Sequence, residues 1–194
     1  MKGVLAGTGV TAGSALGYKI LDGDLHGFVN PLGLPKQYLT FSDDLQVILL
    51  GTGSPLPDFK RSKPALAILA GGKIFLVDCG AGVVLRLLQA GIIPSLIDNI
   101  FITHHHSDHN SGFVDLLVSA ATGGTDDGRN KPMNVLGPLN TKAIIGKLEE
   151  HLEWDVYLRN QQVGTHPDAA KIHYHQMEEG LIYDQDGIKV TIFN

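Results

Sequence analysis

The sequence is poor in cysteine and in charge. Cys79 is the single cysteine among 194 residues, so an internal disulfide is excluded and a cysteine-based zinc site lacks its thiolates. Any metal must therefore be held by histidine and carboxylate. Charged residues make up 18% of the chain and sum to a formal net charge of −5. The average composition thus lacks the basic field that holds nucleic acid, although a local patch stays open.

The chain also lacks a long hydrophobic run. Val4 to Tyr18 are apolar and small, but glycines dilute them, and the stretch is too short and too weakly apolar for stable membrane insertion. It resembles a weak export signal with cleavage positions near 12–14 or 15–17. We expect residues 1–44 to be an N-terminal extension and lead-in, either unstructured or serving as a signal or anchor. The protein is exported to the periplasm if this run is a signal, and cytoplasmic otherwise.

Regular patterns begin at Leu45. Apolar runs predict strands over 46–50, 65–69, 74–77, 97–103, 133–136, 172–175, 181–183 and 188–193. Helical spacing predicts helices around 84–91, over 113–121, and from 141 into the 150s. Gly71-Gly72 and Asp186-Gly187 favour hairpin turns, and Ser111 is a candidate N-cap. Strands in hairpins, followed by helices that alternate with strands, predict mixed sheets covered by helices.

A cluster of potential metal ligands follows the predicted strand that ends at Thr103. His104, His106, Asp108 and His109 lie within six residues. In an extended loop, residues two apart point the same way, so His104 and His106 can hold one ion, and Asp108 and His109 can face a second. Imidazole and carboxylate suit zinc, with manganese or iron also possible. Two adjacent ions can share a hydroxide and polarise an ester. A surface histidine cluster or a tag is disfavoured because the run is internal and follows a buried strand.

The cluster resembles the signature of the metallo-β-lactamase-fold hydrolases. Leu50 to Pro55, Phe75 to Gly80 and Asn99 to Thr103 look like strands and loops of one branch, which comprises ribonuclease Z and its arylsulfatase-like relatives. Arg61 matches that branch's downstream arginine. The resemblance covers about 45–194. It implies an α/β (α+β) fold, the four-layer αββα sandwich, of which these residues form the first half. We expect truncation at the C-terminus, because the family's later ligands would follow Asn194.

The resemblance also implies roles for residues around the cluster. Asp108 is the expected catalytic residue as well as a ligand. Asp78 would buttress the metal loop, the alternative being a cap on the next helix. Gly53, Ser54 and Arg61 would contact substrate, the alternative for the glycine-rich stretch being an ordinary tight turn. The remaining histidines and the cysteine are expected to lie outside the site. His105 should point away from the metals as a packing residue, and Cys79 should be a small apolar filler. His166, His173 and His175 should be structural or solvated.

The implied function is hydrolysis of a phosphodiester or sulfate ester at a binuclear zinc site with a bridging hydroxide. The net acidity and Asn110-Ser111-Gly112 favour a small ester and an arylsulfatase-like enzyme. The first alternative is a ribonuclease Z-type endonuclease that processes transfer-RNA precursors. The second is a non-catalytic interaction module, and a homo-oligomer is an open possibility.

Overall fold

The computed structural model describes residues 45–122 and 129–193. The expected N-terminal extension lies outside these residues, so its boundary at residue 44 and its role as a signal or anchor stay predictions. Within the described ranges, no helix is long and apolar enough to cross a membrane.

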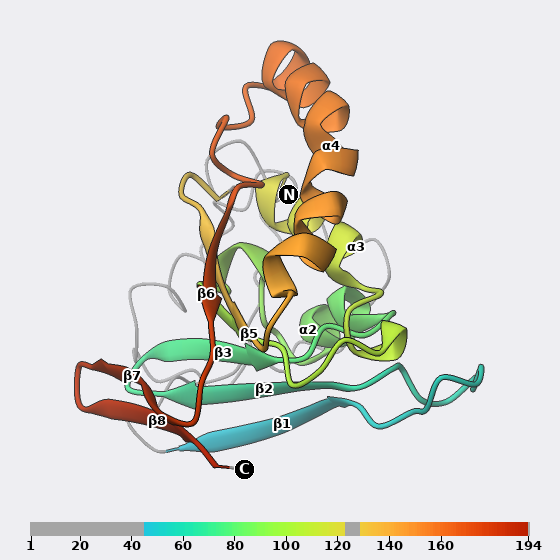
Figure 1. The fold of residues 1–194 in the computed structure, drawn as a ribbon. Helices are drawn as coiled ribbons and strands as arrows, with labels where there is room; N and C mark the ends of the chain where they lie inside the picture. The colour runs from blue at the N-terminus through green and yellow to red at the C-terminus, as the bar shows by residue number, and fades with distance from the viewer. Residues whose placement is uncertain (1–44, 123–128, 194) are drawn as a thin grey trace, which may run out of the picture.

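A six-stranded mixed sheet forms the centre of the molecule (Figure 1). Its strands lie in chain order: β1 (Gln46–Gly51), β2 (Ala65–Ala70), β3 (Lys73–Val77), β4 (Asn99–Phe101), β5 (Met133–Gly137) and β6 (Ile172–Gln176). The first three are antiparallel: a long loop joins β1 to β2, and the two-residue turn Gly71-Gly72 joins β2 to β3 as a hairpin. From β3 to β6 the pairs are parallel, with longer crossovers between them. The carboxyl ends of these four strands therefore share one edge of the sheet.

Helices cover one face of this sheet, and a hairpin packs on the other (Figure 1). The helical layer contains α2 (Val83–Gln89), α3 (Phe113–Ala121) and α4 (Thr141–Val163), with 3-10 turns at Pro94–Leu96 and Ser107–His109. The hairpin pairs β7 (Gly180–Gln185) with β8 (Ile188–Ile192). Alternation along the strands supplies both layers: Leu76 and Ile100 face the helices, whereas Phe75 and Phe101 face the hairpin.

Most predicted elements are confirmed, with three differences at their ends. The strand expected over 97–103 is a ladder of only three residues, Asn99–Phe101, because a 3-10 turn precedes it. Ser111 is not the N-cap of α3. That position belongs to Gly112, and the Ser111 hydroxyl instead accepts a hydrogen bond from the Ala81 amide. The last helix runs on to Val163, where Gly164 ends it in the left-handed conformation.

Candidate metal centre

The histidine cluster lies at the end of the sheet where the carboxyl ends of the parallel strands β3 to β6 meet. Thr103 to His109 follow β4, Asp78 follows β3, and Pro138 follows β5. Open α/β sheets hold their ligands at this edge, because the loops that leave the strands converge there. We call residues 103–109 the metal loop.

The metal loop arranges four donor side chains as two pairs. His104 Nε2 and His106 Nδ1 lie 3.1 Å apart, and His109 Nε2 lies 3.8 Å from Asp108 Oδ2. The rings of His104 and His109 are 4.0 Å apart between centroids, so the pairs are adjacent. Thr103 Oγ1 contacts the other nitrogen of His104 at 3.1 Å. The expected alternation of the loop is therefore present, with His104 and His106 turned toward each other.

Asp78 ties the metal loop to the end of β3. Its Oδ1 accepts hydrogen bonds from the backbone amide and the hydroxyl of Thr103, at 2.8 and 2.9 Å. Its Oδ2 accepts from His109 Nδ1 at 2.7 Å. A carboxylate can only accept, so in a neutral His109 ring this contact places the proton on Nδ1 and leaves the lone pair of Nε2 free. Asp78 is not the cap of α2, which begins after Gly82 with no side-chain cap. Its contacts are those of a buttress, a role that stays a prediction.

Two glycines let neighbouring loops close on the metal loop. A Cβ at Gly80 would collide with the Asp108 carbonyl and the Lys63 side chain, and one at Gly112 would collide with the Gly80 carbonyl. Backbone bonds join the same segments: Cys79 N donates to His109 O at 2.7 Å, and Gly112 N donates to Cys79 O at 2.8 Å. The backbone of the metal loop is therefore fixed from two sides.

The donor set suits zinc in kind and in spacing. Two ligands at ~2.0–2.1 Å from one tetrahedral zinc lie roughly 3.3 Å apart, close to the separation of His104 Nε2 and His106 Nδ1. In the described part of the chain, however, no three histidine, cysteine or acidic side chains gather tightly enough to hold one ion. If the four donors are divided between two ions, each ion has two of them and needs further ligands. Their metal binding stays a prediction.

Known proteins resemble this chain in sequence and in fold. A family model described as Anti-Pycsar protein Apyc1 matches residues 45–127. Ribonuclease Z of Mycobacterium sp. (strain KMS) is 37% identical over 152 residues, which are 76% of this chain and 51% of that protein. Ribonuclease Z of Mycobacterium marinum (strain ATCC BAA-535 / M) is 32% identical over 152 residues, which are 76% of this chain and 53% of that protein.

Two solved structures share the fold at low identity. The metallo-beta-lactamase fold protein YhfI from Bacillus subtilis matches with a TM-score of 0.52 and 16% identity, over 73% of this chain and 50% of that one. A diphosphatase from the PhnP family matches with a TM-score of 0.52 and 20% identity, over 76% of this chain and 56% of that one.

The chain is a ribonuclease Z-like protein of the metallo-β-lactamase fold. It spans about half the length of the curated relatives that it matches. The predicted fold class is thereby confirmed over the described residues. The preference for an arylsulfatase-like enzyme is not supported, because the curated relatives named above are ribonucleases.

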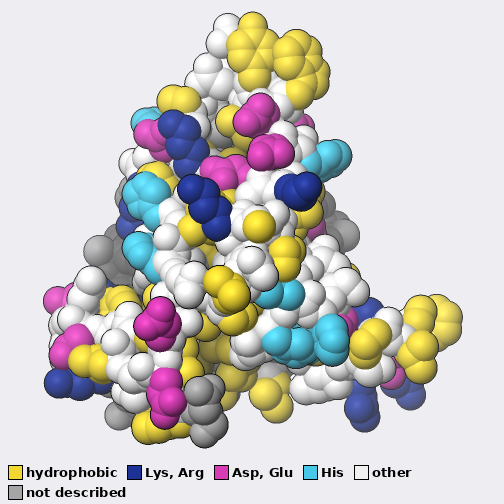
Figure 2. All heavy atoms as spheres, viewed as in Figure 1, with side chains coloured by type: hydrophobic (Ala, Val, Ile, Leu, Met, Phe, Trp, Pro, Cys, Tyr) yellow, Lys and Arg dark blue, Asp and Glu magenta, His cyan; other side chains and the backbone are white. Residues whose placement is uncertain are grey.

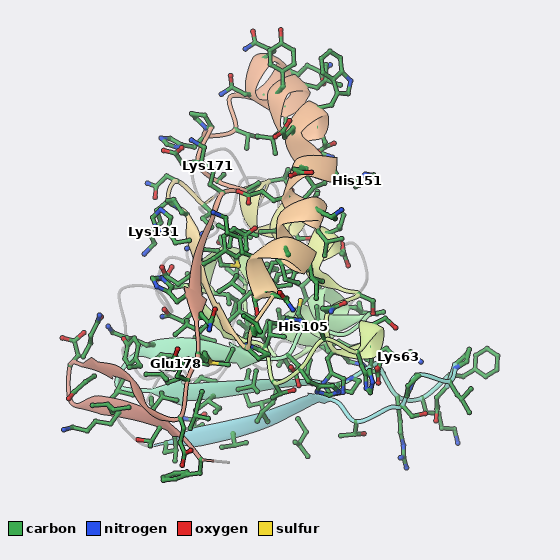
Figure 3. All side chains as sticks on the ribbon, viewed as in Figure 1. Lys63, His105, Lys131, His151, Lys171 and Glu178 are labelled. Atoms are coloured by element: carbon green, nitrogen blue, oxygen red, sulfur yellow. The ribbon has the colours of Figure 1, made fainter. Side chains whose placement is uncertain are left out.

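His105 occupies a distinct place in this ribonuclease Z-like loop. It points away from the donor pairs, as predicted, and its Nε2 lies 3.2 Å from the Leu139 carbonyl and 3.3 Å from the Thr141 hydroxyl. Its Nδ1 is buried without a hydrogen-bond partner among the described residues. His105 therefore does more than pack, because it joins the metal loop to the segment that opens α4 (Figure 3).

The residues predicted to contact substrate, Gly53, Ser54 and Arg61, lie in a protruding loop of this ribonuclease Z-like chain, residues 52–62. Lys63 Nζ donates to the carbonyls of Ser54, Pro55 and Leu56 at 2.6–2.7 Å, and Gly53 N donates to Ser62 O at 2.8 Å. Gly53 and Ser54 thus take part in the loop's own hydrogen bonds through their main chain, and their contact with substrate stays a prediction.

The tip of this loop is more open than its base. Phe59 and Leu56 are 110% and 74% exposed, and Lys60 and Arg61 are also exposed. The sequence did not single out Phe59, although an aromatic residue between Asp58 and two cations in a proline-flanked loop is a usable signal. Figure 2 shows these hydrophobic and cationic side chains gathered on the projection at the lower right.

The other singled-out residues lie outside the donor pairs. Cys79 is fully buried, and burial raises the pKa of its thiol far above the usual range, which confirms it as an apolar filler. His166 Nδ1 accepts from the Asp168 amide at 3.1 Å, and His175 Nε2 lies 3.4 Å from Asn134 Oδ1. His173 is exposed on β6.

Proposed function

We propose that this chain carries the metal-binding loop of a ribonuclease Z-type phosphodiesterase that cleaves transfer-RNA precursors. The observation that carries the proposal is the pairing of four donors on one buttressed loop in a chain 37% identical to a ribonuclease Z. The small-ester hydrolase, which the net acidity and Asn110-Ser111-Gly112 favoured, has no comparable support.

The donors would be divided between two zinc ions. His104 and His106 would hold one, and Asp108 and His109 the other. Bound zinc would supply a nucleophile at neutral pH and would polarise the phosphoryl group. Asp78 keeps the His109 Nε2 lone pair available by holding the ring proton on Nδ1. Asp108, buried beside His109, would orient the attacking water by accepting its hydrogen bond at Oδ2.

The tip of loop 52–62 supplies the local charge that RNA binding needs. Lys60 and Arg61 would neutralise phosphates, and Phe59 would stack on an unpaired base. Such stacking contributes about 1–3 kcal/mol per base. The base of the loop lies against the metal loop, because Lys63 and the Asp108 carbonyl both lie close to Gly80. An RNA strand that contacts the tip would run along the loop toward the donor pairs.

The decisive experiment measures metal content and cleavage together. The protein, expressed in its natural reading frame, should release the trailer of a transfer-RNA precursor when loaded with zinc or manganese, and should lose this activity with a chelator. His106→Ala should abolish cleavage and lower the bound metal. His151→Ala, on the far side of α4 (Figure 3), is the matched control and should change neither.

Two further substrates separate the alternatives. Hydrolysis of p-nitrophenyl sulfate without cleavage of the precursor would restore the arylsulfatase-like reading. Metal binding with no hydrolysis of any phosphodiester would favour the interaction module. RNA affinity should fall as the salt concentration rises. Replacing either Lys60 or Arg61 by a neutral residue should reduce the slope of log affinity against log salt concentration by about 1.

A further inference from the structure

A groove runs between α4 and β6, which pack against each other. Its volume is about 1210 Å³, above the roughly 300–1,000 Å³ of sites that enclose small molecules. One end is formed by Leu139 and Thr141, the residues that His105 contacts from the metal loop. The other end reaches Asn160 and Pro167. The groove is thus long, open, and separate from the donor pairs.

One wall of the groove is the outer edge of strand β6, where some main-chain groups have no neighbouring strand to pair with. Met133 N donates to Lys171 O at 2.9 Å, and Met177 N donates to Gly137 O at 2.7 Å. Main-chain groups alternate in direction along a strand, so those of residues 171, 173, 175 and 177 face β5. Those of Ile172, Tyr174 and Gln176 therefore face outward.

Helix α4 satisfies only the first of these outward groups. Glu149 Oε1 accepts from Ile172 N at 3.0 Å, and Glu149 Oε2 accepts from the Tyr174 hydroxyl at 2.7 Å. No hydrogen bond joins the outward main-chain groups of Tyr174 and Gln176 to another described residue. Both residues line the groove. An unpaired edge of this kind is a template for an added strand.

The opposite wall, on α4, carries basic side chains at one end and acidic side chains at the other. Lys142 and Lys147 line the groove toward the metal loop, and Glu150 and Glu153 line it farther along. None of the four forms an ion pair with another described residue. At 1.5 Å per helical residue the two pairs are centred roughly 10 Å apart. An extended chain covers that distance in about three to four residues, and only an even separation turns two side chains to the same face, so the spacing that suits α4 is four residues.

We propose that the groove binds an extended peptide of a partner protein as an added strand on β6. The peptide carries an acidic side chain toward Lys142 and Lys147, and a basic side chain four residues away, on the same face of the added strand, toward Glu150 and Glu153. RNA is disfavoured by the two glutamates. A second copy of this chain is disfavoured because none of its described edge strands carries an acidic and a basic residue at that spacing.

The test uses two synthetic peptides of threonine and valine. One has Glu at its third position and Lys at its seventh, so that both face the same side of the strand, and the other has the reverse order, so both strand directions are covered. Binding is followed by fluorescence anisotropy and by amide NMR shifts of the natural protein. One of the two should bind and shift the Tyr174 and Gln176 amides. A peptide with threonine at both charged positions should bind at least tenfold more weakly.

Three variants isolate the two walls. Gln176→Pro removes the outward N–H, and proline is tolerated at an edge where the N–H faces out; it should abolish binding. Gln176→Ala changes the same side chain but keeps the N–H, and should bind as the parent does. Glu150→Lys with Glu153→Lys should weaken binding by at least tenfold. Thermal unfolding of each variant confirms that it folds.

Several results would overturn the proposal. They are no binding of either peptide at millimolar concentration, equal binding by the Gln176→Pro variant, or displacement of the peptide by single-stranded RNA. A dimer that dissociates on Gln176→Pro would identify a second copy as the occupant. None of these readouts depends on RNA cleavage, so the peptide site and the proposed hydrolase can fail independently.

Discussion

Replacing Asp78 by asparagine should disable His109 as a ligand while leaving the chain folded. Asparagine adopts the left-handed backbone conformation that Asp78 has, at φ 59°. Its amide must keep oxygen toward the Thr103 N–H, which otherwise loses its acceptor. The amide NH₂ then faces His109 Nδ1, and that nitrogen must become the acceptor. The ring proton moves to Nε2, so the lone pair beside Asp108 disappears.

The magnitudes separate this effect from unfolding. Hydrogen bonds to a charged group contribute about 1.5–3 kcal/mol and neutral ones about 0.5–1.5, so Asp78→Asn should cost about 1–3 kcal/mol of stability. A chain of this size loses about 2–4 °C of Tm for each kcal/mol. Metal affinity of the Asp108–His109 pair should fall by at least the ~10–100-fold that outer-shell changes cause, whereas His104 and His106 keep their geometry.

The assay reads the tautomer before any metal is added. Nitrogen–proton correlation spectra of the histidine rings should place the His109 proton on Nδ1 in the parent and on Nε2 in the variant. Competition with a chelator then gives the affinity. Asp184→Asn, at a surface position on β7, removes the same charge and is the control. An unchanged tautomer together with parental metal affinity in Asp78→Asn would refute the reasoning.

Three further predictions concern other parts of the structure. Gly80→Ala should lower the free energy of unfolding by about 1–3 kcal/mol, because the new methyl collides with Asp108 and Lys63. Gly146→Ala, where the nearest atom is at an ordinary contact distance, should raise it by up to about 1 kcal/mol, and denaturant unfolding measures both. Cys79 should resist iodoacetamide in the folded protein and react only on unfolding, since burial raises its thiol pKa, and mass spectrometry follows the label. Lys63→Met should leave the melting temperature nearly unchanged but expose loop 52–62 to proteolysis, because three carbonyls lose their donor.

The sequence predicted the parts of the fold that local patterns determine. Gly71-Gly72 and Asp186-Gly187 have the positive φ angles that their hairpins need, and the apolar alternation of the strands matches the two layers. The end of α4 was placed too early because its apolar spacing fades after Leu152. Beyond that point the helix continues without a buried apolar stripe, so periodicity gives no signal there.

In the candidate site, too, the features set by local sequence were predicted and those set by contacts between distant segments were not. The turn of His104 and His106 toward each other follows from alternation within one loop, and was predicted. The contacts of His105 with Leu139 and of Lys63 with loop 52–62 are not readable from the sequence. They depend on which loops the sheet brings to one edge. Ser111 failed as a cap for that reason: the hydroxyl found a partner at Ala81, on another loop.

The anchoring of loop 52–62 has a consequence for how such proteins diversify. Asp58 accepts from two amides within the loop, Arg86 donates to Lys60 O and to Ser62 Oγ, and Lys63 gathers three carbonyls. The tip of the loop is therefore held by hydrogen bonds within the loop and from Lys63 and Arg86, and its own side chains take little part in them. Its exposed residues can be exchanged, lengthened or recharged without disturbing Asp78 or the histidines. Substrate range and metal chemistry can then evolve at separate rates within one domain.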